Sequence, residues 1–286
     1  MKRRTITLLI ILLILSSTIV HANALEKLDN HWSNKMIDRM FLAYYFPYLA
    51  KDNFERFDPN GNISEQDFML SLASLFKDND YDISPVGDLN SLNREQMVNR
   101  IGSALKEIRF NDIEYVELPF KDINTMSTDS IELLRELYKN GIIVGEDNST
   151  FNPDRNLTQA EAIIILDRVK EVLEHMNTVA FETVGIVQSY NNQEELIITQ
   201  NSDKVMVTIT KSFPTPGYSM GVKKIRKERD GFRVFMDIIP PKADSIQSQV
   251  LTYKTLTMEI DKRFLGNPPY NFILDGYNKI PIRRTT

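Results

Sequence analysis

Few side chains in this sequence are able to do covalent chemistry. Its 286 residues include three His and no Cys, which excludes thiol catalysis, disulfide scaffolds and thiolate zinc sites. His21 lies in a segment that we expect to be removed, and neither His31 nor His175 lies in a recognisable catalytic motif. No Gly-rich phosphate loop, HExxH helix or Gly-x-Ser-x-Gly elbow occurs. We therefore expect no catalytic residues and no cofactor. A glycosidase with two carboxylates needs no His, so a wall-lytic enzyme stays a weaker alternative.

Two acidic runs resemble calcium loops but lack the residues that such loops need. The runs begin at Asp58 and Asp78 and carry acidic or amide side chains at alternate positions. An EF-hand loop requires Gly at its sixth position, whereas Ile63 and Ile83 stand there. We predict no metal site.

Three short segments pair a helix-capping residue with a side chain that can reach back to it. They are Ser64-Glu65-Gln66-Asp67, Asn93-Arg94-Glu95-Gln96 and Thr158-Gln159-Ala160-Glu161. In each, the first side chain can accept a hydrogen bond from the helix and the fourth can bond back, most closely in the last segment. These patterns predict the starts of three helices.

The three segments belong to an internal repeat. Residues 57–67 match 151–161 type for type at an offset of 94 residues, without a gap. A shortened copy lies between them, where 92–97 aligns with 63–68. Apolar residues at i, i+3 and i+7 predict a first helix at about 31–46 and at about 127–140, and a second helix after each cap. The copies span about 28–77, 78–110 and 118–174.

Residues 28–174 resemble S-layer homology (SLH) repeats. The motifs that carry the resemblance are His31-Trp32, Phe120-x-Asp122-Ile123, Gly141-Ile142-Ile143-x-Gly145, Phe151-x-Pro153 and Thr158-Gln159-Ala160-Glu161. The resemblance implies an all-α bundle of three repeats with grooves that bind acidic secondary cell-wall polysaccharide. It implies that the polysaccharide-binding residues are Trp32, Arg94, Thr158, Gln159 and Glu161.

The sequence departs from that family at its binding signature, Thr-Arg-Ala-Glu. Gln159 and Glu65 replace the Arg in two copies, and the middle copy keeps it as Arg94. Residues 25–174 carry 28 acidic and 16 basic side chains, so the field of this half repels an anionic polymer. Two interpretations stay open: the segments bind wall polymer, or they serve as helix caps, each worth about 1 kcal/mol.

The C-terminal half changes to strand alternation. Residues 205–209, 232–238 and 256–260 alternate apolar with polar side chains, as half-buried strands do. Asp230-Gly231 predicts a tight hairpin between strands at about 218–228 and 232–239. This half carries 11 acidic and 15 basic residues. The fold class that we expect is α+β in two domains, an all-α repeat bundle at 25–174 followed by a small antiparallel β domain at 175–286.

Residues 204–262 resemble the C-terminal domain of the PrcB family of protease-complex subunits. The resemblance rests on Pro214-Thr215-Pro216-Gly217-Tyr218-Ser219, on the basic hairpin, and on Gln249-Val250-Leu251-Thr252-Tyr253. Pro216 replaces the first Gly of the family pattern, and Lys254 stands where Pro is common. The resemblance implies a non-catalytic domain that associates with a secreted protease.

Candidate partner-binding residues in this half are Gly217, Tyr218, Ser219, Lys223 and Lys224. The alternative is that Gly217-Tyr218-Ser219 forms a turn with a core aromatic, and that the basic run is a solvated strand end. The run is too short for a nucleic-acid surface, which needs basic and aromatic side chains over a broad area.

The N-terminus reads as a secretory signal at residues 1–24. Lys2, Arg3 and Arg4 precede an apolar run at 8–15, and Ala22-Asn23-Ala24 forms a cleavage pattern. The run is far shorter than the roughly 20 residues that span a bilayer, so we expect no stable membrane insertion. A secreted protein without Cys fits a Gram-positive-type bacterial envelope. Two hypotheses follow: a wall or S-layer protein that engages a protease or another envelope protein, or a freely secreted protease subunit or inhibitor with the repeats as scaffold.

Overall fold

The computed structural model describes residues 26–108, 115–145, 149–276 and 281–285. Contacts within the chain divide it into two compact units, Met1–Leu173 and Glu174–Thr286. The expected signal peptide lies outside the described residues. Within the described ranges, no helix has both the length and the apolar character that crossing a bilayer requires.

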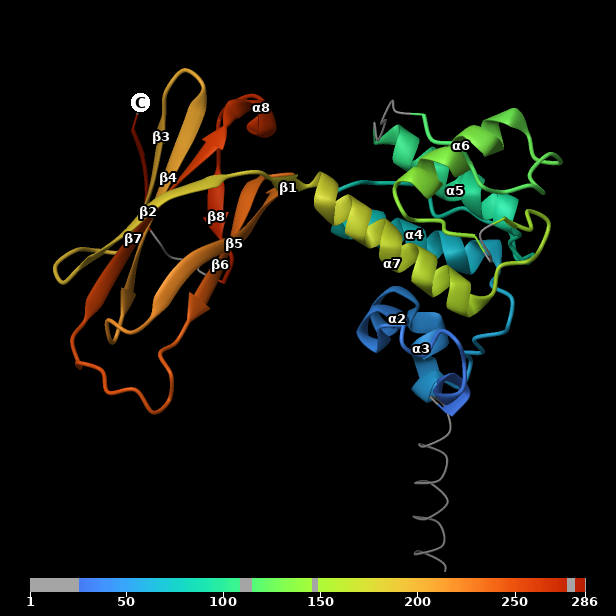
Figure 1. The fold of residues 1–286 in the computed structure, drawn as a ribbon, viewed down its shortest axis with the longest axis horizontal. Coiled ribbons are helices and arrows are strands. Elements are labelled where there is room, and N and C mark those ends of the chain that lie inside the picture. The colour runs from blue at the N-terminus through green and yellow to red at the C-terminus, as the bar shows by residue number, and fades with distance from the viewer. Residues whose placement is uncertain (1–25, 109–114, 146–148, 277–280, 286) are drawn as a thin grey trace, which may run out of the picture. The chain divides into compact units, whose positions relative to one another are not determined.

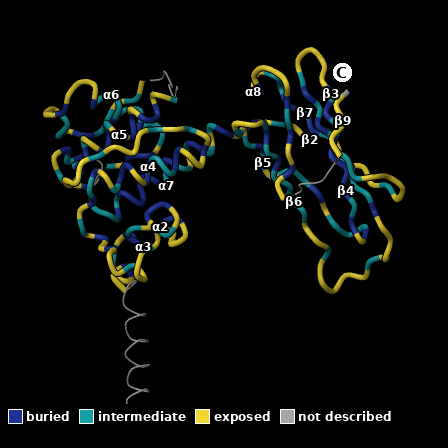
Figure 2. Tube along the Cα trace, turned by 180° about the vertical axis from the view of Figure 1, so that it is seen from behind, coloured by how far each residue is buried: buried dark blue, intermediate teal, exposed yellow. Residues whose placement is uncertain are grey.

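The first unit is a cluster of helices (Figure 1). Their bounds are Arg39–Tyr45 (α2), Pro47–Phe54 (α3), Glu65–Asp78 (α4), Arg94–Glu107 (α5), Thr128–Lys139 (α6) and Gln159–Met176 (α7). Each of α4, α5 and α7 turns an apolar stripe inward, so buried segments concentrate where these helices meet (Figure 2). Phe68, Leu72 and Leu166 are among the side chains with no exposed surface.

Three backbone hydrogen bonds close a ring between the segments that precede α4, α5 and α7. Ile63 N–H donates to the Leu157 carbonyl (3.0 Å), Leu157 N–H to the Leu92 carbonyl (2.7 Å), and Leu92 N–H to the Ile63 carbonyl (3.0 Å). All three side chains are buried. Each copy therefore donates to one of the other copies and accepts from the remaining one.

The first N–H groups of the same helices are also satisfied by another copy. A helix leaves its first four N–H groups without acceptors of its own. Here the first two donate to the loop of another copy, which holds the three helix starts together. The pairs are Glu65 to Asn90 and Gln66 to Asp88 (α4), Arg94 to Arg155 and Glu95 to Pro153 (α5), and Gln159 to Gly61 and Ala160 to Pro59 (α7).

The expectation of an all-α bundle was wrong. The segments around the ring form antiparallel bridges, which pair Asn62 with Thr158, Ser64 with Ser91, and Asn93 with Asn156. Helical periodicity in a sequence reports on helices. It carries no signal for pairing between short extended segments that lie far apart in the chain.

The first helices of the copies differ from one another. In the last copy, α6 closely follows the range expected from periodicity and begins at the cap Ser127. In the first copy the expected helix at 31–46 is shorter, because Asp38 caps α2 and Pro47 begins α3. In the middle copy, residues 79–93 run from α4 to α5 without a helix.

The second unit consists of two sheets. The strands are Thr178–Val179 (β1), Glu182–Ser189 (β2), Glu195–Gln200 (β3), Lys204–Phe213 (β4), Ser219–Glu228 (β5), Gly231–Ile239 (β6), Thr252–Asp261 (β7), Phe272–Leu274 (β8) and Ile282–Thr285 (β9), with the short helix Lys262–Leu265 (α8) after β7. One sheet has the order β1-β5-β6-β8 and the other β2-β7-β4-β3-β9. Their inward side chains form one core, which includes Val207, Ile225 and Met258.

The hairpin expected at Asp230-Gly231 is present, and it joins β5 to β6 with Glu228 opposite Gly231. Gly231 has φ +144°, and a Cβ there would lie 2.4 Å from the Asn271 carbonyl oxygen, so only Gly fits.

The expectation that the β domain is purely antiparallel was also wrong. Strand β9 pairs with β3 in parallel, and β8 pairs with β6 in parallel. The chain is therefore a mixed α/β protein with two mixed sheets. Alternation of apolar and polar residues predicts which face of a strand is buried. It does not predict whether a neighbouring strand runs parallel or antiparallel, because that depends on how the strands are connected.

The ring predicts that its three amides exchange with solvent as one unit. Asn93→Ala removes the acceptor of the Gln96 N–H (2.8 Å) and should lower the stability of the first unit by about 1 kcal/mol. Hydrogen exchange at Ile63, Leu92 and Leu157 should then speed up by a common factor of about fivefold. Amides of β4 serve as the internal reference. Faster exchange at Leu92 with unchanged exchange at the other two would contradict the ring as one cooperative element.

Candidate functional site

A pocket in the first unit gathers three of the predicted polysaccharide-binding residues, Trp32, Arg94 and Glu161. It encloses about 130 Å³, less than the roughly 300–1,000 Å³ of pockets that enclose whole small molecules. It can take part of one sugar ring from a longer chain. The remaining lining residues are Met36, Ile143, Val144, Gly145, Ile164, Ile165 and Arg168.

Trp32 forms an exposed aromatic wall of this pocket. Its side chain is 59% exposed, although the ring is the largest apolar group that this chain has. His31 fixes the segment, because its two ring nitrogens lie 2.7 Å from Ser33 Oγ and 3.2 Å from Asn60 Oδ1. The His31 and Trp32 rings are 5.4 Å apart. An indole held in place and open to solvent can pack against the apolar face of a ligand ring.

Arg94 lies at the base of the pocket and is 4% exposed. Its Nε donates to the Phe151 carbonyl (2.7 Å), and its guanidinium lies 4.8 Å from the centre of the Phe151 ring. Its Nη1 is 3.3 Å from Glu161 Oε1. The sequence identified Arg94 as a cation for a polymer, and the structure places that charge against a carboxylate of the chain itself.

Glu161 connects the pocket to the start of α7. Its carboxylate accepts from Arg155 (2.5 Å) and from the Thr158 N–H (3.0 Å), while the Glu161 N–H donates to Thr158 Oγ1 (3.3 Å). Burial raises the pKa of Glu161, but the bonds to Arg155 and Thr158 and the charges of Arg94 and Arg155 outweigh it and hold that pKa below its usual range. The carboxylate stays ionised at neutral pH.

Arg168 is a pocket residue that the sequence analysis missed. It donates to the Ile142 carbonyl (3.2 Å). Burial lowers the pKa of Arg168, against the charges of Glu171 and Asp167, but a guanidinium titrates so far above neutral pH that it stays charged. The signal was available, because Arg168 follows Glu161 by seven residues and so lies on the same face of α7.

Thr158 and Gln159 do not line the pocket. Thr158 acts in the cap described above, and Gln159 Oε1 accepts from the Asp58 N–H (3.0 Å) of the first copy. Both side chains therefore hold segments of the unit together.

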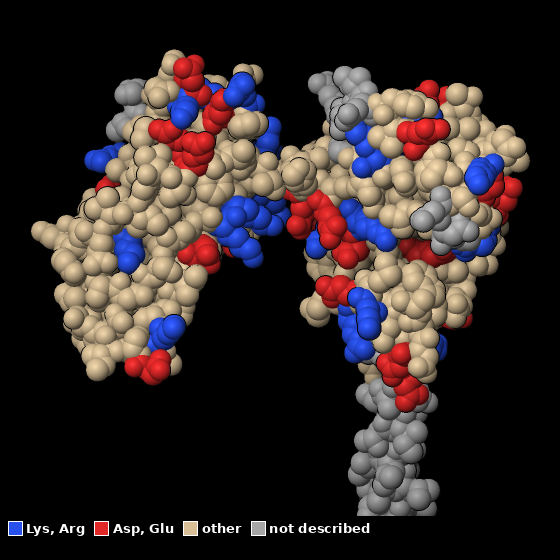
Figure 3. Space-filling view, viewed as in Figure 1, with Lys and Arg blue, Asp and Glu red and all other residues tan. Residues whose placement is uncertain are grey.

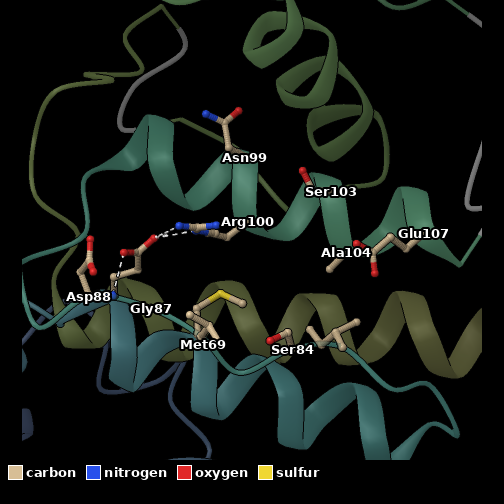
Figure 4. A pocket seen from close by; sticks show the side chains of 12 residues that line it. Met69, Ser84, Gly87, Asp88, Asn99, Arg100, Ser103, Ala104 and Glu107 are labelled. Carbon is tan, nitrogen blue, oxygen red and sulfur yellow. Dashed lines mark hydrogen bonds and ion pairs between the residues drawn. The ribbon is translucent and has the colours of Figure 1, made fainter.

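A second groove lies between α4 and α5 and encloses about 330 Å³. Figure 4 shows Arg100 of α5 pointing toward Gly87 and Asp88, with Ser84 further along the same loop, whereas Asn99 points to the other side of α5. Polar and apolar residues share the lining, whereas apolar residues predominate at the pocket of Trp32. The middle copy has no first helix, and the extended segment 79–93 forms one wall of this groove.

Glu65 replaces the signature Arg at this second groove. Its Oε1 accepts from Arg100 Nε (2.6 Å) and its Oε2 from the Asp88 N–H (2.9 Å). Burial raises the pKa of Glu65, but these bonds and the Arg100 charge hold it below its usual range. The cation of this groove thus comes from the second turn of α5. The sequence offered no sign of the pair, because the two residues lie 35 positions apart.

In the second unit, the Gly217-Tyr218 pair is accounted for by packing. The Tyr218 ring stacks on Phe213 with 5.2 Å between ring centres, and it packs against the core. A Cβ at Gly217 would lie 2.4 Å from Gln247 Oε1 and 2.9 Å from the Pro241 side chain. Glycine is needed there because the 240–251 segment passes close by.

The remaining candidates of the second unit lie at its surface. Ser219 and Lys223 are exposed, and Lys223 occupies a bulge between Val222 and Lys224. Lys224 Nζ lies 5.1 Å from the centre of the Phe235 ring. Figure 3 shows Lys and Arg side chains gathered over β5. In this basic cluster, Lys224 Nζ lies 3.7 Å from Glu174 Oε2 and Arg226 pairs with Glu228 (2.5 Å), whereas Lys223 is exposed to solvent.

Two His residues lie in the described part of the chain. His31 is bonded as described above, and His175 is exposed near the end of α7. In the part of the chain that the structure describes, no three His, Asp or Glu side chains meet as a metal site would require.

Glu161→Gln should destabilise the first unit in a pH-dependent way. A carboxylate with a lowered pKa adds stability above its usual pKa of about 4.3, and that stability disappears as the pH falls. We expect a loss of about 2 kcal/mol at pH 7, typical of a hydrogen bond to a charged group, and a smaller difference at pH 3.5. Urea unfolding at the two pH values measures both.

The matched control for this change is Glu132→Gln, at an exposed position on α6. It should leave stability within about 0.5 kcal/mol of wild type. An equal effect of Glu161→Gln at both pH values would show that the charge of Glu161 contributes nothing.

Comparison with known families gives two matches. Residues 119–163 match the S-layer homology domain, and residues 204–253 match the PrcB C-terminal domain. No curated protein matches the chain significantly. An S-layer homology domain implies association with the cell surface, and a PrcB C-terminal domain suggests an accessory role in a protease complex. The chain thus carries an S-layer homology domain followed by a PrcB C-terminal domain.

Proposed function

We propose that this is a non-catalytic envelope protein with two binding tasks. The first unit binds an acidic secondary cell-wall polysaccharide, and the second unit engages a secreted protease. The observation that carries the first task is the pocket where exposed Trp32 stands beside Glu161 and Arg168.

The chemistry of the pocket suits a sugar ring with an acidic substituent. The indole of Trp32 supplies an apolar face, and the carboxylate of Glu161 accepts from sugar hydroxyls. The pocket lining holds two guanidinium groups, those of Arg94 and Arg168, and one carboxylate, that of Glu161, so the lining has a net positive charge. Salt screens distant charges more than close ones. The positive charge at the pocket therefore affects a bound ligand more than the net negative charge of residues 25–174 does.

The second task rests on the PrcB C-terminal match and on the basic cluster over β5. The match suggests an accessory role in a protease complex, so we assign the domain the role of holding or restraining the protease. An acidic region of that protease is the expected counterpart of Lys223 and Lys224.

A second candidate function is a freely secreted protease-complex subunit with the repeats as scaffold. One observation favours it. The three equivalent first-turn positions, Glu65, Arg94 and Gln159, each contact another copy within the unit. Residues occupied in this way hold the fold together whether or not a polymer binds.

Co-sedimentation with purified cell walls separates the two candidates. The protein lacking residues 1–24 should pellet with intact walls and stay in solution with walls stripped of secondary polymer. Trp32→Ala should weaken binding about tenfold or more, since truncating an aromatic anchor typically costs about 2 kcal/mol. Tyr44→Ala is the matched control, because Tyr44 is 64% exposed and lies outside the pocket. Wild-type protein that stays in solution with intact walls would favour the scaffold.

Affinity purification from culture medium tests the second task. A protease should co-purify with the wild-type protein, and Lys223→Glu should reduce its recovery severalfold, because reversing a surface charge opposes an acidic partner. Lys242→Glu changes an exposed Lys outside the basic cluster and should have no effect. Equal recovery with both variants would remove the basic cluster from the interface.

A further inference from the structure

Strand β2 is an edge of the five-stranded sheet and carries one charged residue, Glu182 at its start. It is the first strand in the order β2-β7-β4-β3-β9, and among the described residues its backbone pairs with β7 alone. From Thr183 to Ser189 it has no charged residue and no Pro. The far side of its backbone therefore presents N–H and carbonyl groups that await another strand.

Three side chains of β2 are apolar and exposed, and they lie on both faces of the strand. Val184, Ile186 and Val187 are 58%, 49% and 66% exposed, and Tyr190, just past the strand, is 61% exposed. None of them belongs to the core of the second unit. In Figure 3, few charged side chains appear where β2 and β7 run. The fold does not explain why these positions are apolar.

The outermost strands at the other sheet edges in the described part of this unit are either charged or short. Strand β9 carries Arg283 and Arg284, and Arg284 is bonded to Asn271. Strands β1 and β8 are two and three residues long. Proteins shield their edges with charges, short strands and bulges. The bulge of β2 lies near its start, between Thr183 and Gly185, and leaves 185–189 regular.

We propose that the edge of β2 accepts an extended segment of a protein partner, which adds to the sheet as a strand. Backbone groups in a row at this spacing match another strand and neither a sugar nor a helix. Apolar side chains on both faces of β2 favour a segment with apolar residues on both of its faces. Strand β2 precedes the residues that match the PrcB C-terminal domain, but it pairs with β7, whose first two residues lie within the match. This inference rests on the proposed engagement of a protease and says where that engagement occurs.

A second copy of the chain fits this edge less well. The regular stretch is about 17 Å long and a sheet is about 10 Å thick, so the edge alone offers about 170 Å² against the roughly 800 Å² per partner of a stable interface. An extended segment is not confined to this area, because its side chains can also cover the apolar side chains on both faces of β2.

The test uses the protein lacking residues 1–24 and a phage library of random nonapeptides. Selected peptides should carry alternating apolar residues and bind as synthetic peptides in fluorescence anisotropy. Ile186→Lys and Val187→Lys should each weaken binding at least tenfold. Ile282→Lys, at the opposite edge with the same residue type and 50% exposure, should bind as wild type. N-methylation along one backbone edge of the peptide should abolish binding, and along the other edge should not.

Several outcomes would overturn the proposal. They are the absence of any selected peptide, peptide binding that is indifferent to Val187→Lys or to N-methylation, and a dimer of the protein that Ile186→Lys converts to monomer in sedimentation. Thermal unfolding by circular dichroism confirms that each variant is folded. If the protease of the purification above is recovered equally by wild type, Ile186→Lys and Val187→Lys, the proposed function stands and this inference fails. If peptides bind the edge and no protease is recovered, the proposed function fails and the edge remains a strand-addition site.

Discussion

The first unit depends on the ring of three main-chain hydrogen bonds between Ile63, Leu92 and Leu157. These groups are buried with their side chains, so opening the ring leaves donors and acceptors unpaired away from water, which is costly. The ring also brings three helix starts to one centre. A first-turn side chain there must face the loop of another copy, which is why Arg94 reaches Phe151 and Glu65 reaches Asp88.

Local chemistry made much of the fold predictable from the sequence. The caps at Ser64, Asn93 and Thr158 and the hairpin at Asp230-Gly231 each depend on residues within a few positions of one another. The parallel pairing of β8 and β9 and the bridges of the first unit depend on segments far apart in the chain. These pairings were not predicted, and for that reason the expected fold class was wrong.

Some features of the candidate site were likewise predictable from the sequence, and others were not. Trp32, Arg94 and Glu161 were found because they occupy fixed positions of a repeat, and the structure places them in one pocket. The burial of Arg94 could not be read from its position, because it follows from the stacking of Phe151 and from the carboxylate of Glu161. At Glu65 the signature Arg is replaced by a carboxylate, and Arg100, which lies outside the motif, supplies the cation that pairs with it.

The closed ring also limits how such a chain can change in evolution. A solenoid has free ends, so it can lengthen by one repeat at a time. In the first unit, each central donor and acceptor is already used by the other two copies, so a fourth copy would find no place and a lost copy would leave the remaining two unmatched. Duplication should therefore succeed in sets of three. The middle copy has no first helix between α4 and α5, yet its Leu92 closes the ring and its Asn93 pairs with Asn156 beside it.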